Sequence, residues 1–296
     1  MLLLLTTAGD GTSDRLAYRL GNQVFRLNFD QLPEYKISFE LNKWYVENPV
    51  GLSISSDVAT RVLWWKAFGA TPDGYDKYLI EESKYFFREI YSWFRDHGKI
   101  KGNSIEFHNS FGKMRIAKIA SKYFNVPDSL ITYKLTNESA VKKQCRIVKS
   151  LSSVLVAEGK ALFTSDVSNK ELNSNFPWYI QEKIEAKSDL TFFVVGKKIF
   201  GFERSRANLE GLDWRAEQSL DGSTEEWFPF EATEKFEEDL LLLNADLGIE
   251  WGRYDFMLTK AGEIKFLEFN ANGQWVFLDF QEKYGLLDCV VEYLKS

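Results

Sequence analysis

Hydrophobic and polar positions alternate most clearly in two neighbouring segments of the last quarter of the chain. Tyr254–Leu258 and Ile264–Phe269 have the composition of strands, and the residues between them include a glycine. This pattern predicts a β-hairpin. On its first strand Asp255 lies between large apolar residues, and on its second Glu268 and Asn270 are two residues apart. Since side chains two apart on a strand leave the same face, the latter pair should lie together.

These three oxygen-bearing side chains form a candidate metal site. Placing them in an apolar run is costly unless something compensates for their desolvation. Mg²⁺ held jointly by carboxylates and nucleotide phosphates does so, because it prefers hard oxygen ligands. The alternative is an exposed hairpin whose polar side chains face water. We favour the metal site because Asp255 is opposite Glu-x-Asn and Asn272-Gly-Gln274 follows.

The rest of the pattern predicts an α/β protein in which strands and amphipathic helices alternate. A βαβ-like opening is expected, and so is an aromatic helix that ends at Gly98. The expected strands are 2–7, 24–28, 35–41, 130–132, 146–150, 154–157, 161–164, 178–184, 190–195 and 198–202. Four helices are expected, of which the first starts at 12–14. The second covers 75–97, with an apolar face of Leu79, Phe86, Ile90 and Trp93, and the third opens at 109–113, with Met114, Ala117, Ala120 and Phe124 on one face. The fourth is marked by Phe236, Leu240, Leu243 and Leu247.

Composition narrows the function classes. The 296 residues are 45% hydrophobic and 16% aromatic, which excludes a disordered protein, and the net charge of −6 argues against a nucleic-acid partner. The two cysteines, Cys145 and Cys289, are far apart and fit a reducing compartment. The opening Met-Leu-Leu-Leu-Leu lacks a basic segment, and no apolar run has membrane-spanning length, so we expect a cytoplasmic protein without a membrane partner. His97 and His108 occur in no catalytic or metal-binding context.

The hairpin also carries a resemblance to a known family. Asp-Phe-x-Leu at 255–258, then Phe-Leu-Glu-x-Asn-x-Asn-Gly-Gln-Trp at 266–275, resembles the end of ATP-grasp ligases. It is most similar to the graspetide synthetases, of microviridin or grasp-with-spasm type, which build macrocycles into ribosomal peptides. The resemblance is loose over nearly the whole chain and good over 178–276. It implies an N-terminal pre-ATP-grasp domain (1–100), a central subdomain with a leader-peptide-binding hairpin (101–185) and a C-terminal subdomain with the metal site (186–296).

Residue roles follow from the same resemblance. Asp255, Glu268 and Asn270 would hold the magnesium ions, and Lys149, in an Ile-Val-Lys setting, would reach the nucleotide phosphates. Lys113 matches a second phosphate-binding lysine, although for both lysines an exposed surface position is the alternative. The hinge that pairs with adenine would be Gln181, Glu182, Lys183 and Ile184, which a plain core strand explains almost as well.

One further position agrees with the family, and one departs from it. Arg215, in Gly-Leu-Asp-Trp-Arg, resembles a family arginine that grips a carboxylate or developing phosphate charge. A structural salt bridge to Asp213 or Glu217 is the alternative. Thr191 stands where many relatives carry arginine.

The implied activity is ATP- and Mg²⁺-dependent ligation that forms ADP. A side-chain carboxylate of Asp or Glu is phosphorylated and joined to Ser or Thr (ester) or Lys (amide). The implied partner is a ribosomal precursor peptide, leader plus core, and a homodimer is left open. Two alternatives stand beside this hypothesis: a carboxylate–amine ligase with another acceptor, and a nonenzymatic ATP-binding module.

Overall fold

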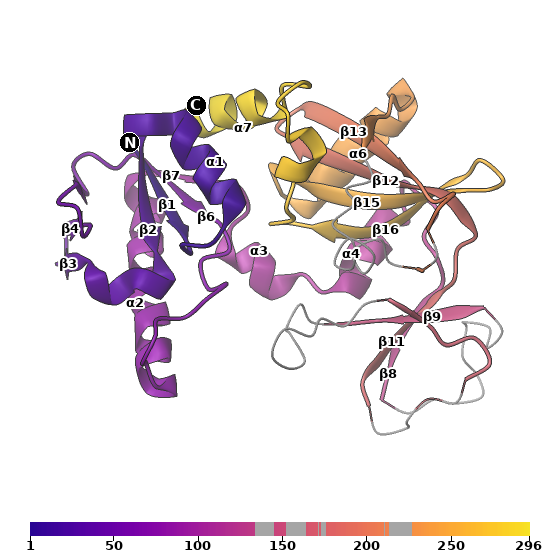
Figure 1. The fold of residues 1–296 in the computed structure, drawn as a ribbon, viewed down its shortest axis with the longest axis horizontal. Helices are drawn as coiled ribbons and strands as arrows, with labels where there is room; N and C mark the ends of the chain where they lie inside the picture. Colours follow the sequence, from indigo (N-terminus) through magenta and orange to yellow (C-terminus); the bar gives the residue numbers. More distant parts are fainter. Residues whose placement is uncertain (134–144, 152–163, 171, 173–175, 210, 213–226) are drawn as a thin grey trace.

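The computed structural model describes residues 1–133, 145–151, 164–170, 172, 176–209, 211–212 and 227–296 (Figure 1). Its strands form four sheets, whose orders are β2-β1-β6-β7, β3-β4-β5, β10-β9-β11-β8 and β14-β13-β12-β15-β16. The strands are β1 Leu2–Thr6, β2 Val24–Asn28, β3 Lys36–Phe39, β4 Trp44–Glu47, β5 Ser53–Ser55, β6 Arg61–Trp64, β7 Lys99–Lys101, β8 Ser129–Thr132, β9 Arg146–Lys149, β10 Ser165–Asp166, β11 Trp178–Glu182, β12 Ala186–Val195, β13 Lys198–Ser205, β14 Phe228–Pro229, β15 Trp251–Thr259 and β16 Ile264–Asn270. The helices are α1 Gly11–Leu20, α2 Lys77–His97, α3 Ile105–Ser110, α4 Lys113–Ala120, α6 Glu234–Leu247 and α7 Leu286–Lys295. None of the helices in the described ranges is long and apolar enough to cross a membrane.

The first sheet is parallel and confirms the βαβ opening. Strand β1 pairs with β2 on one side and β6 on the other, and α1 makes the crossover to β2. Because alternate side chains leave opposite faces of a strand, Leu2 and Leu4 pack toward α1 and α7, while Leu3 and Leu5 pack toward α2. Both faces are therefore covered by helices, as a continuous leucine run in a parallel strand requires.

The predicted helix over 75–97 is present, and its expected apolar face is correct in part. Ile90 is fully buried, and Phe86 and Trp93 are partly buried against the same core. The most buried side chains are Phe87, Ile90, Tyr91 and Phe94, a clean i, i+3, i+4, i+7 stripe. Leu79 is 45% exposed. Aromatic residues occur around most of this helix, so several stripes fit its sequence, and only packing on the sheet selects one of them.

The helix that was expected to open at 109–113 needs a similar correction. It is α4, and it buries Ile116 and Ala120. Met114 is exposed, and Phe124 lies beyond the end of the helix, where it packs on Phe236 and Phe256. The predicted strands 154–157 and 161–164 fall almost wholly outside the described residues.

The antiparallel sheet β14-β13-β12-β15-β16 confirms both predicted hairpins. On β12, Leu190, Phe192 and Val194 pack with α6 in one hydrophobic core. By alternation Asp189 and Thr191 leave the opposite face of the sheet. Near these two residues the opposite face is polar, and the site described below is built there, whereas Phe193 and Val195 farther along the same face are apolar and buried.

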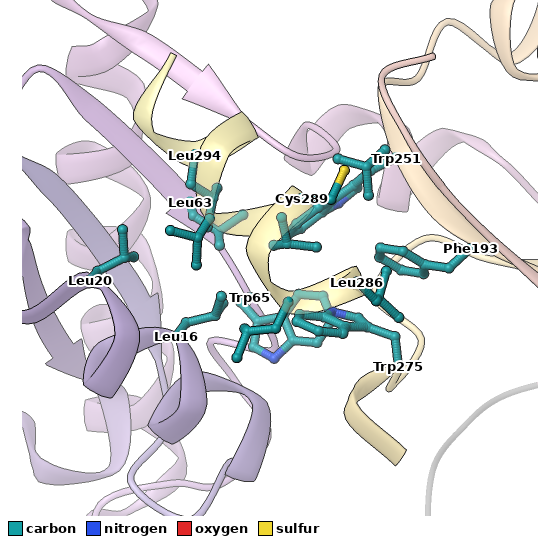
Figure 2. Close-up of a cluster of buried hydrophobic side chains, with 14 of the residues drawn as sticks. Leu16, Leu20, Leu63, Trp65, Phe193, Trp251, Trp275, Leu286, Cys289 and Leu294 are labelled. Carbon is teal, nitrogen blue, oxygen red and sulfur yellow. The ribbon is translucent and has the colours of Figure 1, made fainter. Parts of the chain in front are cut away.

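Helix α7 joins the parallel sheet to the antiparallel one. Figure 2 shows its Leu286, Cys289 and Leu294 in one cluster with residues of β6, β12 and β15. Trp65, directly after β6, meets Trp251 of β15 edge-on, with ring centroids 5.7 Å apart. The two sheets therefore share a buried core, which fixes where the end of β6 lies relative to β15.

Candidate active site

A cavity of about 770 Å³ lies between the sheets. Strands β15 and β16 line one wall, and β9 and β11 line another. Lys66, two residues after the end of β6, reaches the cavity from the parallel sheet. All the predicted site residues that the structure describes line this cavity: Lys113, Lys149, Gln181, Glu182, Lys183, Ile184, Asp255, Glu268 and Asn270. Arg215 and its motif partner Asp213 lie outside the described residues.

The three predicted metal ligands converge on the β15–β16 hairpin. Asp255 is directly opposite Glu268, and a β-bulge follows in which Leu267 is the extra residue. The amide Nδ2 of Asn270 lies 2.6 Å from Asp255 Oδ2 and 3.4 Å from Glu268 Oε1. The register therefore brings these side chains within hydrogen-bonding distance on one face, as the alternation predicted.

Protein donors surround the Asp255 carboxylate. Arg253 donates from Nε to Oδ1 and from Nη2 to Oδ2, both at 3.0 Å. Thr191, which is opposite Asp255 on β12, donates its hydroxyl to Oδ1 at 2.8 Å. Thr191, the position at which the resemblance leads us to expect arginine, thus supports a carboxylate here. Such charge-assisted bonds hold the carboxylate in one orientation.

Lysines from two other elements line the same cavity as this hairpin. The ammonium of Lys113, at the start of α4, lies 3.6 Å from Glu268 Oε2 and donates to the Ser150 carbonyl at 3.1 Å. Lys149 is the last residue of β9 and is paired with Tyr179 of β11. Positive charge thus meets negative charge across the cavity.

The predicted hinge is the end of β11 and the residues after it. The N–H of Glu182 donates to the Asp128 carbonyl at 2.8 Å, and that of Lys183 to the Cys145 carbonyl at 3.1 Å. Gln181 is fully buried; its Nε2 donates to Ser129, but within the described ranges its Oε1 has no hydrogen-bond partner. A buried acceptor that lacks a hydrogen-bond partner favours the binding of a ligand that supplies a hydrogen-bond donor.

The Lys183 side chain points to β10 and donates to Asp166 at 2.7 Å. That hydrogen bond, with those from the Ser168 hydroxyl and N–H, holds the pKa of Asp166 well below its usual range, and it raises the pKa of Lys183. The Lys183 side chain therefore fastens β10, and only its backbone is left for the role that the sequence predicts in the hinge.

Solved structures with this arrangement of elements exist. A RiPP-associated ATP-grasp ligase from Chryseobacterium gregarium, in complex with ADP and a leader and core peptide, superposes with a TM-score of 0.83 at 23% identity, over 99% of this chain and 96% of that one. The chain has the ATP-grasp fold. The macrocyclase MdnC from Microcystis aeruginosa MRC, bound with precursor peptide MdnA, gives 0.78 at 21% identity, over 100% of this chain and 99% of that one.

The same fold extends to a more distant enzyme. D-alanyl-alanine synthetase A from Vibrio cholerae gives a TM-score of 0.58 at 16% identity, over 100% of this chain and 98% of that one. No protein-family model and no curated protein matches the sequence.

The donor set of this ATP-grasp site fits a magnesium ion. Two carboxylates and an amide supply the hard oxygen ligands that Mg²⁺ prefers, and nucleotide phosphates and water would complete an octahedron. The Asn270 amide would present its oxygen after a flip. Among the described residues no three His, Cys, Asp or Glu side chains form a metal-binding group. The two carboxylates alone therefore suit a metal that phosphates help to hold.

Several cavity residues were not singled out from the sequence. Arg206 donates through Nη1 to both oxygens of Asp189 at 2.8 and 2.9 Å, and through Nη2 to the Leu212 carbonyl. Burial raises the pKa of the Asp189 carboxyl, and Arg206 opposes that shift. Arg253 and Lys66 are the other two. Arg253 could have been noticed from Arg-x-Asp, which puts both side chains on one strand face. The sequence Trp64-Trp65-Lys66 resembles a Trp-Arg-Arg-like element of the graspetide synthetases, but the likeness is loose and implies no chemistry for Lys66.

Proposed function

We propose that this chain is an ADP-forming ATP-grasp ligase that joins Asp or Glu side chains of a ribosomal precursor peptide to Ser or Thr as esters or to Lys as amides. One observation carries the proposal: Asp255, Glu268 and Asn270 converge in a cavity that also holds two lysines and the hinge. The full-length likeness to ligases solved with ADP, leader and core peptides supports this substrate class. We further propose the cytoplasm, where ATP is supplied, as its compartment.

The hinge would bind the adenine of ATP. The N–H groups of Glu182 and Lys183 already have carbonyl partners, whereas within the described ranges the Ile184 N–H has none. Ile184 would thus donate to a ring nitrogen of the base. The amino group of adenine would supply the donor that Gln181 Oε1 lacks.

The phosphates would then extend toward the β15–β16 hairpin. Lys149 and Lys113 would place positive charge beside them, as lysine does well as a compact cation. Asp255, Glu268 and Asn270 would hold Mg²⁺, which neutralises phosphate charge during transfer. Arg253 and Thr191 would keep Asp255 oriented, and Arg215 would grip the substrate carboxylate or the transferred group.

The reaction would proceed in two displacements. A carboxylate oxygen of the substrate attacks the γ-phosphorus, the bond to the β–γ bridging oxygen breaks, and ADP leaves. The hydroxyl or amine of the second side chain then attacks the acyl carbon, and phosphate departs with the bonding electrons. The proton of the nucleophile is lost to phosphate or solvent, so each ring removes one water from the peptide. Such phosphoryl transfer needs positioning and charge stabilisation more than a protein nucleophile.

Intact mass spectrometry tests the proposal. The substrate is a short peptide rich in Thr, Ser, Asp and Glu, encoded beside this gene, incubated with the protein, ATP and Mg²⁺. We expect ATP-dependent loss of one water per ring. Glu268→Gln should abolish it, whereas Glu263→Gln, in the exposed turn of the same hairpin, should not. ADP release without mass loss would point to a ligase with another acceptor, and nucleotide binding without turnover to a nonenzymatic module.

A further inference from the structure

Lys66 enters the cavity from an unusual backbone conformation. It lies two residues after the end of β6 and has φ of 48°, in the left-handed region that residues other than glycine, asparagine and aspartate rarely adopt. A turn fixes this conformation, because the Gly69 N–H donates to the Lys66 carbonyl at 3.0 Å. Residues held this way cluster at functional sites, where surrounding contacts stabilise them.

Contacts with the antiparallel sheet and its following loop pin this turn. Trp65 Nε1 donates to Asp10 Oδ1 at 2.9 Å, and Gln274 Nε2 donates to Asp10 Oδ2 at 2.8 Å. Arg253 in turn donates from Nη1 to the Gln274 carbonyl at 2.7 Å. This chain of bonds connects the turn that carries Lys66 to the arginine that orients Asp255.

The Lys66 ammonium has no hydrogen bond or ion pair with any residue that the structure describes. Burial and the charge of Arg253 lower its pKa, and Asp10 opposes this effect. Asp10 is not a bonded partner, because its carboxylate already accepts from the Ser13 N–H and hydroxyl as well as from Trp65 and Gln274. A half-buried cation beside a second cation is unfavourable until an anion arrives.

On the basis of the proposed function, we propose that Lys66 is a substrate-binding residue that holds the side-chain carboxylate receiving the phosphoryl group. The nucleotide would be anchored at β11, which belongs to a different sheet from β6 and lies far from it in Figure 1. A triphosphate running from the hinge to the metal ligands already meets Lys149 and Lys113. Lys66 reaches the cavity from the side of the parallel sheet. The carboxylate that accepts the phosphoryl group would lie on this side of the cavity.

Peptide affinity provides a test that does not depend on turnover. The probes are the neighbouring-gene peptide and a version in which its Asp and Glu residues are Asn and Gln, each bound in the presence of Mg²⁺ and ADP. Lys66→Gln should weaken binding of the acidic peptide about 10-fold, equivalent to about 1.4 kcal/mol. It should leave the amide peptide and ADP unchanged. Lys66→Arg should retain most of the acidic-peptide affinity.

Two further variants keep the test clean. Lys66→Asn is also neutral and tolerates the left-handed backbone, so it should reproduce Lys66→Gln without strain. Lys43→Gln, at an exposed lysine of the same N-terminal region, should bind both peptides normally. Equal weakening of both peptides, or weaker ADP binding, would overturn the role of Lys66. Wild-type protein that binds peptide but forms no ring would instead count against the ligase.

Discussion

Arg253 and Asp255 are two residues apart on β15, and the guanidinium reaches both oxygens of the carboxylate at 3.0 Å. The arginine therefore binds the same carboxylate oxygens that would coordinate a metal at this hairpin. Neither side chain is more than 20% exposed, so water screens their interaction less than it would at the surface. The carboxylate is held in place before any metal arrives, and the metal must share it.

We expect Arg253→Met to tighten the binding of Mn²⁺ in the absence of nucleotide. Removing a neighbouring positive charge is worth about 1 kcal/mol in bulk water and more at a partly buried site, so we expect the affinity to change by roughly fivefold or more. Electron paramagnetic resonance of free Mn²⁺ measures this directly. Lys260→Met is the matched control, since Lys260 is an exposed cation of the same hairpin paired with Glu185. Unchanged affinity in Arg253→Met would show that the arginine does not compete for Asp255.

Thr191→Val should destabilise the fold, although valine has nearly the same shape. The hydroxyl that donates to Asp255 is lost, and hydrogen bonds to charged groups contribute about 1.5–3 kcal/mol. Urea unfolding compares this variant with Thr191→Ser, which keeps the hydroxyl and removes only a methyl group. A valine variant more stable than the serine variant would mean that packing outweighs the hydrogen bond here.

Gln274→Leu should loosen the junction between α1 and the loop after β16. Gln274 donates to Asp10 and accepts a hydrogen bond from Thr12, so leucine removes both contacts at similar size. We expect a loss of about 1–3 kcal/mol in the free energy of unfolding, measured by denaturant titration. Gln281→Leu, at an exposed position nearby in the chain, should change it by no more than about 0.5 kcal/mol. Similar losses in both variants would indicate a general surface effect.

The Asp166–Lys183 pair predicts a pH dependence. The folded-state pKa of Asp166 is depressed, so its stabilising contribution is present above the unfolded pKa of about 4 and is lost as pH falls below it. The difference in melting temperature between wild type and Asp166→Asn should be constant from pH 8 to pH 5 and shrink below about pH 4. The two side chains are 29% and 38% exposed, so solvent screens the pair in part and we expect less than about 1 kcal/mol. A difference that grows on acidification would reverse the assigned sign.

The hairpin with Asp255, Glu268 and Asn270 could be predicted because its information is local. Alternation over a few residues sets the strand faces, and the predicted segments agree with β15 and β16 within a few residues at each end. The fold class also followed from local periodicity. In contrast, the contact of Thr191 with Asp255 depends on the register of β12 against β15, two strands separated by 64 positions.

Lys66 is the extreme case of this limit. The Trp64-Trp65-Lys66 sequence resembles the family only loosely and implies no chemistry, and the position of Lys66 depends on how the parallel sheet docks on the antiparallel one. The errors on α2 and α4 have the same origin. Helical periodicity shows that a face is apolar, but when apolar residues surround the helix, tertiary packing decides which stripe is buried.

The packing of α7 constrains the order in which the chain can acquire its structure during synthesis. Leu2 and Leu4 share their core with Leu294, and Lys99 donates to the Ser296 carbonyl at 2.8 Å. On a ribosome the first strand emerges almost 300 residues before its covering helix. Helix α1 can cover part of this face of β1 early, but the part that packs on α7 stays uncovered until translation has delivered that helix.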